Sequence, residues 1–518
     1  MSKVMKEFLN KLKNWKENFE INEYKNDSGN ISQITTMLRE KNITGLLALW
    51  DKKLKQDYFE LTHPEYPEII SRAIYNIQHN MANFIFMVDK DNKYPWIIGQ
   101  CESFINIIIT KNNIFTVSNA NHNAIYLNIK KLQELDSDLL KYSNKKFGFL
   151  LGQIRPYHFF YDHFKYLCEF NRNIKSKEMK QISQDKAFYK YGDKSINSDN
   201  TVYLFPAINS NNQNDDKIKQ LNEQMEKYVY KDALKDFNPI THSSDTLKLW
   251  YGITGQKRSW LEQIEGCENI VLKLLEYYPK IELIIDGMTA TEGEVIKNEE
   301  DEKVYSQIAK KLEGKCKITS LIGKDYRHKI QVCSTTDIFI ANAGTGCIVP
   351  LRFCKKAGVL HSNSKLMTFR DTYPDTIKFF DKKYEIDVPD PKMERGDFCS
   401  YHIPWQHIFN LASEVLNQTK GTNIKLLDVP LVKEIAKEYK LQELEKNKFI
   451  IPFENIKNKI KANSQSADIL REVALAFEKS GDITTAKTIM QKALMLRPNG
   501  PFIKKKLEEY KKILGEKK

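Results

Sequence analysis

The chain has 518 residues, a formal net charge of +13 and 41% hydrophobic residues. A chain of this length is too long for one ordinary hydrophobic core, so we expect two or three domains. No run of about 20 uncharged apolar residues occurs, which argues against a membrane-spanning helix. The basic residues are spread along the chain, whereas a nucleic-acid-binding protein concentrates them in one patch. We therefore expect no nucleic-acid partner.

The first residues and the cysteines indicate a cytoplasmic setting. Residues 1–20 are charged throughout and lack the apolar core of a signal peptide. The eight cysteines are scattered without a CxxC pair or a metal-ligand spacing, so we expect reduced thiols. Lysine is densest near the C-terminal end, at residues 504–506, 511–512 and 517–518. Peripheral attachment to the anionic inner face of a membrane is therefore an alternative to a freely diffusing protein.

The apolar pattern divides the chain into four predicted parts. Residues 1–30 are predicted to form a lysine-rich helix that packs on the body of the protein, with membrane-surface attachment as the alternative. Residues 31–240 and 245–420 are predicted to form two α/β domains, and residues 430–518 a helical region. The apolar positions of the N-terminal helix follow a near-helical spacing: Val4, Phe8, Leu12, Trp15 and Phe19.

Short apolar runs bounded by turn residues predict the strands of both α/β domains. In the second domain the runs alternate with helical segments, which predicts a parallel, doubly wound sheet with ligands at the carboxyl ends of its strands. The predicted strands of the first domain are 84–88, 105–109, 114–117, 147–151 and 202–205. Those of the second domain are 247–253, 281–285, 316–322, 338–341 and 358–360.

A small-residue turn follows one of these strands. The run Asn342-Ala343-Gly344-Thr345-Gly346 connects the strand to a predicted helix that carries Pro350 in its first turn. Backbone N–H groups at a helix N-terminus favour an anion, so this turn can hold a phosphate. The alternative is a tight strand-to-helix connection without a ligand.

Two cations precede another predicted helix, which is expected to begin with a capping box of Ser259 and Glu262. Cations at this end of a helix are disfavoured by its dipole, so Lys257 and Arg258 suggest that an anion neutralises them. A solvated pair in a lysine-rich loop is the alternative. Together with the glycine turn on the same edge of the sheet, they predict a nucleotide-diphosphate site. Its candidate residues are Gly255, Lys257, Arg258, Asn342, Gly344, Thr345 and Gly346, with His361 and Ser362 as candidates for contacts to ribose or base.

A histidine and an aspartate in the first domain are candidates for catalysis. His158 and Asp162 lie four residues apart near the start of a predicted helix and share one face of it. Imidazole titrates near neutrality, so His158 is a candidate general base that Asp162 orients. A structural histidine is the alternative, and His163 is a competing base. Asp286 ends a strand without an acidic partner, so no metal is predicted.

One segment near the C-terminal end fits a tetratricopeptide repeat. Residues 467–500 carry small and apolar residues at the helix-packing positions of that repeat. A single repeat cannot bury its own face, so we expect it to pack on the body of the protein or on adjoining helices. The matching positions are Leu470, Val473, Ala474, Phe477, Gly481, Ala486, Met490, Ala493 and Pro498.

This arrangement resembles the GT-B glycosyltransferases, most clearly over residues 247–416. The strand–Asn342-Ala343-Gly344-Thr345-Gly346–helix segment is similar to the donor-phosphate loop of family 61-like bacterial transferases, many of which carry His-Gly-Ala there. The repeat is similar to those of protein O-GlcNAc transferases, which carry their repeats before the catalytic domain. The resemblance implies two Rossmann-like domains, with residues 31–240 on the acceptor side and 245–420 binding a nucleotide sugar in a cleft between them.

We therefore predict a metal-independent, inverting glycosyltransferase without a cofactor. It would move a sugar from a nucleotide-sugar donor to a hydroxyl of a glycan, lipid-linked or protein acceptor. The alternative is a binding or assembly protein of the tetratricopeptide type, with a protein partner on the repeat and a non-catalytic nucleotide-binding-like domain. A dinucleotide-dependent oxidoreductase is disfavoured because the full GxGxxG motif is missing.

Overall fold

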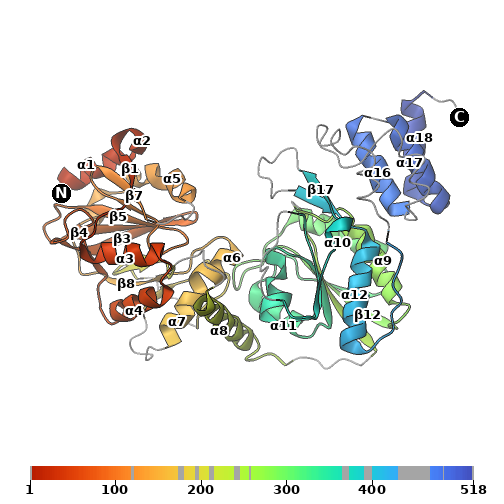
Figure 1. Cartoon of the computed structure of the whole chain (residues 1–518), viewed down its shortest axis with the longest axis horizontal. Helices are drawn as coiled ribbons and strands as arrows, with labels where there is room; N and C mark the ends of the chain where they lie inside the picture. The colour runs from red at the N-terminus through yellow and green to blue at the C-terminus, as the bar shows by residue number, and fades with distance from the viewer. Residues whose placement is uncertain are drawn as a thin grey trace. The chain divides into compact units, whose positions relative to one another are not determined.

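The computed structural model divides the chain into two compact units, Met1–Asp232 and Ala233–Lys518. Both combine helices and strands, as the predicted α/β class requires (Figure 1). The structure describes residues 3–117, 122–172, 180–192, 198–208, 215–238, 245–255, 258–364, 373–389, 399–429, 467–481 and 483–515. Within these ranges no helix is both long enough and apolar enough to cross a membrane.

The first unit contains a seven-stranded sheet in the order β1-β7-β6-β5-β4-β3-β2. Strands β2 to β7 form an antiparallel meander, and only β1 joins it in parallel, beside β7. The strands are β1 Glu20–Glu23, β2 Glu60–Thr62, β3 Ile70–His79, β4 Ala82–Asp89, β5 Trp96–Gln100, β6 Ile107–Ile109 and β7 Asn113–Thr116.

The prediction that residues 31–240 form a Rossmann-like domain is wrong for this sheet. A parallel pair needs a crossover of a dozen or more residues, whereas antiparallel neighbours need only a short turn. Strands β3 and β4 are joined through Asn80, and β4 and β5 through a loop that contains Asn92; both asparagines adopt a positive φ. These connections are too short to hold a helix, so consecutive strands pair antiparallel.

The central strands β4, β5 and β6 of this sheet are buried on both faces, with α1 and α2 on one side of the sheet and α3 and α4 on the other (Figure 1). The predicted helix over residues 1–30 is in fact two short helices followed by strand β1. Its packing on the body is confirmed, because Phe8, Leu12, Trp15 and Phe19 all lie in the core beside the strands. The helical elements are α1 Lys3–Leu12, α2 Trp15–Asn18, α3 Gly29–Arg39, α4 Ile43–Leu54, α5 Asn123–Ile129, η1 Lys130–Glu134 and η2 Ser137–Leu139.

A second, three-stranded sheet in the first unit has the order β10-β8-β9 and is parallel throughout. Its strands are β8 Lys146–Leu150, β9 Ile182–Ser183 and β10 Thr201–Leu204. Between β8 and β9 the chain forms one continuous helical stretch of α6 Pro156–His158, the π-helical η3 Phe159–Phe164 and α7 Lys165–Arg172. This stretch carries the candidate base.

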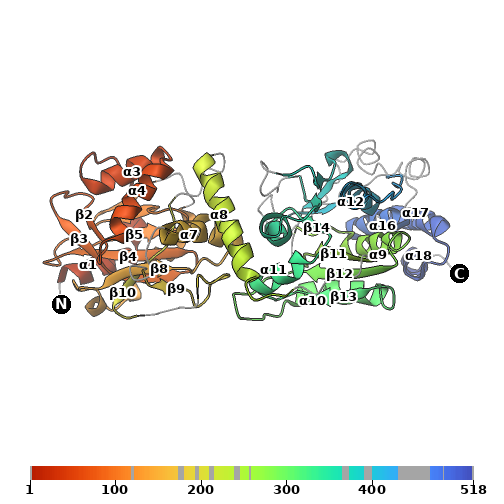
Figure 2. The same ribbon diagram turned by 90° about the horizontal axis from the view of Figure 1, so that it is seen from below.

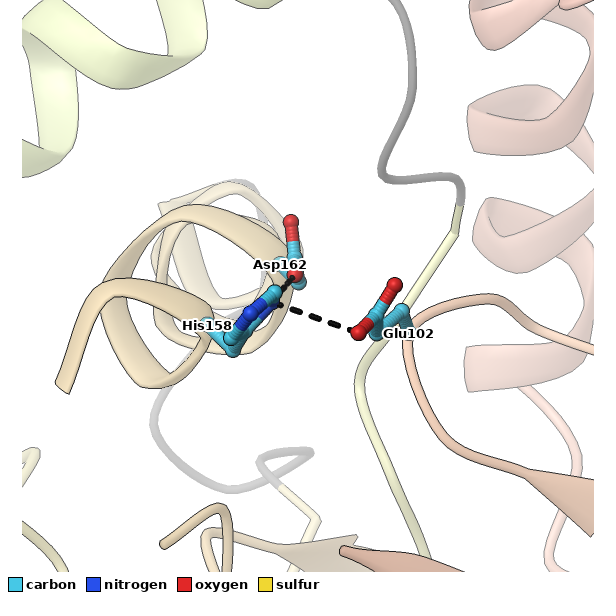
Figure 3. A group of neighbouring side chains, drawn as sticks. All are labelled: Glu102, His158 and Asp162. Atoms are coloured by element: carbon cyan, nitrogen blue, oxygen red, sulfur yellow. Dashed lines mark hydrogen bonds and ion pairs between the residues drawn. The ribbon is translucent and has the colours of Figure 1, made fainter. Parts of the chain in front are cut away.

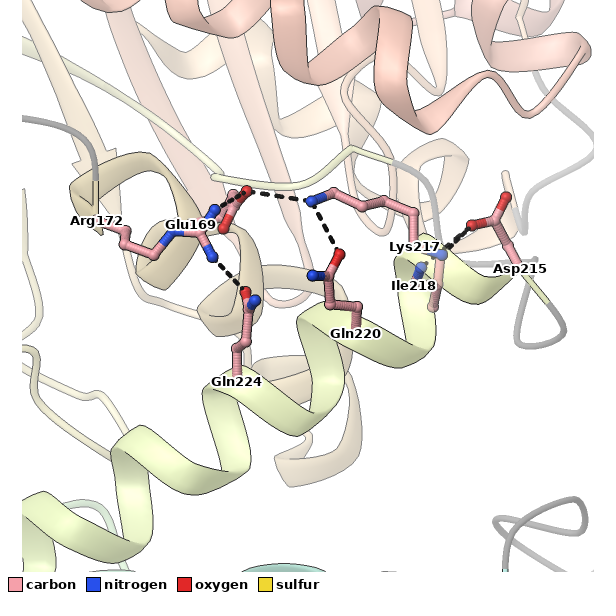
Figure 4. Close-up of polar contacts among 7 residues, drawn as sticks. All are labelled: Glu169, Arg172, Asp215, Lys217, Ile218, Gln220 and Gln224. Atoms are coloured by element: carbon pink, nitrogen blue, oxygen red, sulfur yellow. Dashed lines mark hydrogen bonds and ion pairs between the residues drawn. The ribbon is translucent and has the colours of Figure 1, made fainter.

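Helix α8 (Asp216–Ala233) lies against α7 through polar contacts (Figure 4). Arg172 donates to Gln224 at 2.9 Å, and Lys217 lies 3.5 Å from Glu169. Asp215 accepts the first amides of the helix, from Lys217 at 2.8 Å and from the next residue at 3.2 Å. These contacts hold α8 to the helical stretch on which His158 lies.

The second unit contains a six-stranded sheet in the order β13-β12-β11-β14-β15-β16, and all of its neighbouring pairs are parallel. Numbered along the chain, this order is 3-2-1-4-5-6, so the direction of winding reverses between β11 and β14. The strands are β11 Thr246–Gly252, β12 Lys280–Asp286, β13 Lys317–Ser320, β14 Ile338–Asn342, β15 Gly358–His361 and β16 Ile377–Phe379. The parallel sheet predicted for this part of the chain is confirmed.

Alternate residues of this sheet bury their side chains against α9, α10 and α12, while α11 lies on the opposite face (Figures 1 and 2). These helices are α9 Gln263–Leu274, α10 Glu299–Lys311, α11 Tyr326–Ser334 and α12 Trp405–Lys420. The smaller elements are η4 Thr345–Cys347, the π-helical η5 Ile348–Phe353, η6 Lys382–Tyr384, and the antiparallel pair β17 Ile386–Pro389 and β18 Cys399–His402.

The predicted capping box at the start of α9 is wrong. Ser259 donates its hydroxyl to the Thr254 carbonyl at 2.6 Å, and the helix begins only at Gln263. The chain pairs with β18 instead, because the Tyr401 amide donates to Ser259 at 3.1 Å and Tyr401 accepts from Leu261 at 2.9 Å. Pairing with a strand that is distant in the sequence therefore overrides a local capping signal.

Three helices close the described part of the second unit: α16 Ala467–Ser480, α17 Ile483–Leu496 and α18 Pro501–Ile513. The apolar repeat positions of α16 and α17 are buried in one cluster, which confirms a packed helix pair. Gly481 turns the chain between the two helices with φ of +87°. The cluster includes Ile386 of β17, and Arg471 lies 3.0 Å from Glu265 of α9. The expected packing on the body is thus present.

Candidate active site

Two groups of polar side chains carry the predicted site residues, one in each unit. The first is on the helical stretch after β8. Arg155 is extended and Pro156 opens the helix, as expected from a residue whose fixed φ suits the first turn. The π-helical turn that follows buries its aromatic residues in the core of the unit. Asp162 and His163 are buried with them.

His163 anchors this helix to the segment after β5. Its Nε2 lies 2.8 Å from the carbonyl oxygen of Cys101. Complete burial lowers the pKa of His163 to about 4, so the ring is neutral and its N–H donates to that carbonyl. His163, the competing candidate base, therefore binds the backbone at Cys101. The residue after Cys101 is Glu102, and this anchor brings its side chain to His158.

His158 lies between two carboxylates (Figure 3). Its Nδ1 is 2.6 Å from Asp162 Oδ2 and 3.5 Å from Glu102 Oε1. Its side chain is 24% exposed, whereas that of Asp162 is 3% exposed. The structure thus brings the predicted pair into contact and adds Glu102, which the sequence analysis missed. No local signal identifies Glu102, because it lies 56 positions before His158 in a different segment.

The two carboxylates change the basicity of His158. Burial alone lowers the pKa of an imidazole, but the hydrogen bond and charge of Asp162, followed by the charge of Glu102, raise the pKa of His158 above its ordinary value. Burial also raises the pKa of Glu102. A histidine whose Nδ1–H donates to a carboxylate keeps Nε2 as the atom that can accept a proton. The arrangement is that of a base and its orienting acid.

The same three residues could hold a metal ion. Their ligand atoms lie within 4.8 Å of one another. A metal on His158 Nδ1 would displace the hydrogen bond to Asp162, so that nitrogen cannot both bind a metal and hold the ring in place for a base at Nε2. The prediction that no metal is required remains a prediction.

The second group lies at the carboxyl ends of the strands in the six-stranded sheet. The loops after β11 and β14 leave neighbouring strands at the point where the strand order reverses. The Asn342 side-chain amide donates to the carbonyl oxygen of Arg258 at 3.3 Å, so the two predicted loops are in contact. Arg258 adopts a positive φ of 56°. Lys257 lies outside the described residues.

Gly255 has a structural role that differs from its predicted role in binding a diphosphate. Its amide donates to Asp301 Oδ1 at 2.8 Å, and the other oxygen of Asp301 accepts the amide of Met288 at 2.7 Å. A Cβ at position 255 would lie 2.6 Å from the carbonyl oxygen of Glu300. The buried carboxylate of Asp301 therefore joins the loops after β11 and β12. The amide of Gly255 is already engaged and is not free for a phosphate.

Asn342 and His361 meet on a tyrosine that the sequence analysis missed. Tyr401 of β18 places its hydroxyl 2.7 Å from the Asn342 side-chain nitrogen and 2.8 Å from His361 Nδ1. All three side chains are buried, as is that of Ser362. Burial lowers the pKa of His361 to about 3, so this ring is neutral at physiological pH.

The glycine turn itself is partly open to solvent. Thr345 and Gly346 are exposed, and a Cβ at Gly346 would meet no heavy atom within 4 Å. Gly344 is buried, and its carbonyl oxygen accepts from the Cys347 amide at 3.2 Å. The predicted helix after the turn is a single 3₁₀ turn followed by π-helical η5. Backbone at this position can approach a bound anion closely.

Asp286 at the end of β12 is explained by a buried cation. Lys329 of α11 places Nζ 2.6 Å from Asp286 Oδ1, and it also donates to the carbonyl oxygens of Gly287 and Met288 at 2.8 and 3.0 Å. Neither charged side chain is exposed by more than 4%. Asp286 is therefore engaged by a buried counter-ion.

Comparison with known proteins adds no assignment. The chain matches no family model, and a search of curated proteins finds no match.

Proposed function

We propose that the protein is a metal-independent, inverting glycosyltransferase that uses a nucleotide-sugar donor. The observation that carries the proposal is the reversal of strand order between β11 and β14, with both predicted loops at that point. In open parallel sheets, ligands bind outside the carboxyl ends of the strands where the order reverses. The order 3-2-1-4-5-6 is that of Rossmann-like nucleotide-binding sheets.

The proposed donor site neutralises the leaving diphosphate without a metal. Arg258 supplies a guanidinium, which can bind phosphate oxygens in a bidentate manner. Thr345 and Gly346 supply exposed backbone on the neighbouring loop, which contacts the Arg258 backbone through Asn342. Such fixed donors stabilise charge that develops as the diphosphate leaves. Lys257, adjacent in the sequence, adds a second cation to the same loop.

His158 is the proposed base. As the acceptor hydroxyl oxygen forms a bond to the anomeric carbon, its proton passes to His158 Nε2. The bond from that carbon to the diphosphate oxygen breaks, and its electron pair leaves with the diphosphate. Asp162 orients the ring and stabilises the imidazolium that results. The proposed reaction takes place in the cytoplasm, where nucleotide sugars are supplied. The acceptor would be a glycan, a lipid-linked saccharide or a protein.

The first experiment is a thermal-shift panel of UDP, GDP, CMP and NAD on the purified full chain. We expect UDP or GDP to raise the melting temperature. A shift with NAD alone would instead favour an oxidoreductase, and no shift with any nucleotide would remove the basis of the proposal.

The second experiment measures donor hydrolysis and sugar transfer. We expect His158→Ala to lower the rate about 100-fold or more while nucleotide binding is kept. Arg258→Ala should weaken nucleotide binding, and His79→Ala serves as a control outside both groups. Full activity in both His158→Ala and Arg258→Ala would contradict the site assignment. EDTA treatment should leave the rate unchanged; loss of activity that Mn²⁺ restores would favour metal binding at Glu102, His158 and Asp162.

A further inference from the structure

The hydrogen bonds around Tyr401 determine where the proton of His361 lies. The side-chain nitrogen of Asn342 can only donate, so the Tyr401 oxygen accepts from it at 2.7 Å. The tyrosine has one hydroxyl proton, and its other partner is His361 Nδ1 at 2.8 Å. That proton is therefore donated to Nδ1. The neutral ring must carry its own proton on Nε2.

The resulting N–H has no acceptor. His361 Nε2 is buried and has no hydrogen-bond partner among the described residues. The ring cannot turn freely to find one, because Trp260 packs against it with a centroid separation of 5.1 Å. The Trp260 ring is in turn held by a hydrogen bond from its indole nitrogen to the carbonyl of Ile403 at 2.8 Å. A buried donor without a partner is explained by strain, by a bound water or ion, or by a ligand. At the edge of the sheet where ligands bind, a ligand is the explanation pursued for His361.

The position of this donor matches the site proposed above. His361 ends β15, directly beside Asn342 at the end of β14. The glycine turn is also hydrogen-bonded to the end of β15, because the amide of Ala343 donates to the carbonyl oxygen of His361 at 2.8 Å. Tyr401 therefore links Asn342, where the glycine turn begins, to the neutral imidazole of His361 at the end of the neighbouring strand β15.

We propose that Tyr401 is a positioning residue that holds His361 as the Nε2–H tautomer, so that this N–H binds an uncharged acceptor oxygen of the nucleoside part of the donor. The inference rests on the proposed function. A neutral imidazole in an apolar setting suits a base carbonyl or a ribose hydroxyl, whereas the diphosphate would be bound by Arg258 and the exposed turn. Tyr401 itself touches no substrate in this arrangement.

The test compares full-length wild type with Tyr401→Phe, which keeps the ring and removes only the hydroxyl. We measure the binding of UDP, GDP and inorganic pyrophosphate by calorimetry. The variant should bind the nucleoside diphosphate that wild type prefers about ten-fold more weakly, as expected for one lost hydrogen bond, and should bind pyrophosphate unchanged. Equal weakening for nucleotide and pyrophosphate would mean a general structural effect and would overturn the proposal.

A double-mutant cycle shows whether Tyr401 acts through His361. In a His361→Ala background, Tyr401→Phe should weaken nucleotide binding clearly less than it does in wild type, because the group that it positions is gone. Additive losses would contradict the inference. Tyr510→Phe is the matched control: its buried hydroxyl donates to Glu478 at 2.8 Å in the C-terminal helices, and nucleotide binding should not change.

A measurement without nucleotide separates the two proposals. Imidazole ¹⁵N chemical shifts distinguish the tautomers of a neutral histidine, and wild type should show His361 protonated on Nε2. In Tyr401→Phe this preference should be lost. If wild type binds no nucleoside diphosphate, the proposed function and the ligand assigned to His361 both fail. If wild type binds one but His361 is protonated on Nδ1, only the inference about Tyr401 fails.

Discussion

Single carboxylates and imidazoles in this protein differ in role because their surroundings differ. His158, His163 and His361 are all substantially buried, yet only the pKa of His158 is raised. The difference is the hydrogen bond and charge of Asp162 together with the charge of Glu102, which outweigh the effect of burial on the pKa of His158. His163 and His361 are neutral hydrogen-bonding groups, and His158 alone is suited to take up a proton near neutral pH.

Asp162→Asn should lower the pKa of His158, because the substitution removes the charge and keeps an acceptor of the same size. Histidine NMR titrations measure this directly. Glu102→Gln should lower it less, since Glu102 is 3.5 Å from Nδ1 and Asp162 is 2.6 Å. A larger shift in Glu102→Gln, or none in Asp162→Asn, would contradict the arrangement.

The raised pKa of His158 determines how the free energy of unfolding changes with pH. Protonated His158 stabilises the folded state fully below the ordinary histidine pKa, and this stabilisation is lost as the pH rises through the raised value. The difference in free energy of unfolding between wild type and Asp162→Asn should therefore decrease as the pH rises from the ordinary histidine pKa through the raised pKa of His158. Denaturant unfolding at a series of pH values measures it.

The buried pair of Lys329 and Asp286 should matter for stability. Lys329→Met leaves Asp286 buried without its counter-ion, which costs about 3–5 kcal/mol in comparable cases. Denaturant unfolding followed in the second unit measures the loss. Lys317→Met is the matched control: Lys317 lies 2.8 Å from Glu282 but is 69% exposed, so its loss should cost less than about 1 kcal/mol. Equal costs would mean that burial of the pair is unimportant.

At the scale of elements, two glycines near the proposed donor site differ in the space available for a side chain. A Cβ at Gly255 would lie 2.6 Å from Glu300 O and 2.7 Å from the Asp301 amide, whereas one at Gly346 would meet nothing within 4 Å. Gly255→Ala should therefore destabilise the second unit by about 1–3 kcal/mol. Gly346→Ala should leave the melting temperature unchanged and weaken nucleotide binding, because its methyl group stands on exposed backbone. Unfolding measurements and calorimetry separate these effects; an unchanged Gly255→Ala stability would contradict the close packing.

Element types were largely predictable, but their pairing was not. The apolar runs predicted strands such as β4, β11 and β14, and the repeat pattern predicted the α16–α17 pair. The antiparallel meander of the first unit was missed because an apolar run looks the same in either kind of sheet. Its direction depends on whether the connection has room for a helix.

At the scale of the whole molecule, each compact unit has its own sheets and its own buried core. Residues 1–232 and 233–518, expressed separately, should each unfold cooperatively. The proposed donor residues all lie in the second unit, so that fragment alone should show the UDP or GDP thermal shift, and the first should not. Circular dichroism and thermal shift on both fragments test this. A shift that requires the intact chain would contradict the assignment of the donor site to the second unit.

By itself the sequence determined the α/β class, the parallel sheet of the second unit, and His158 with Asp162. Each of these depends on residues close together in the chain, where spacing along a helix or strand decides which side chains share a face. Only the tertiary structure brought Glu102 to His158, Tyr401 to Asn342 and His361, and Asp301 to the amide of Gly255. Those partners come from segments far apart in the sequence. Contacts of this kind depend on strand order and packing, which no local pattern of residues encodes.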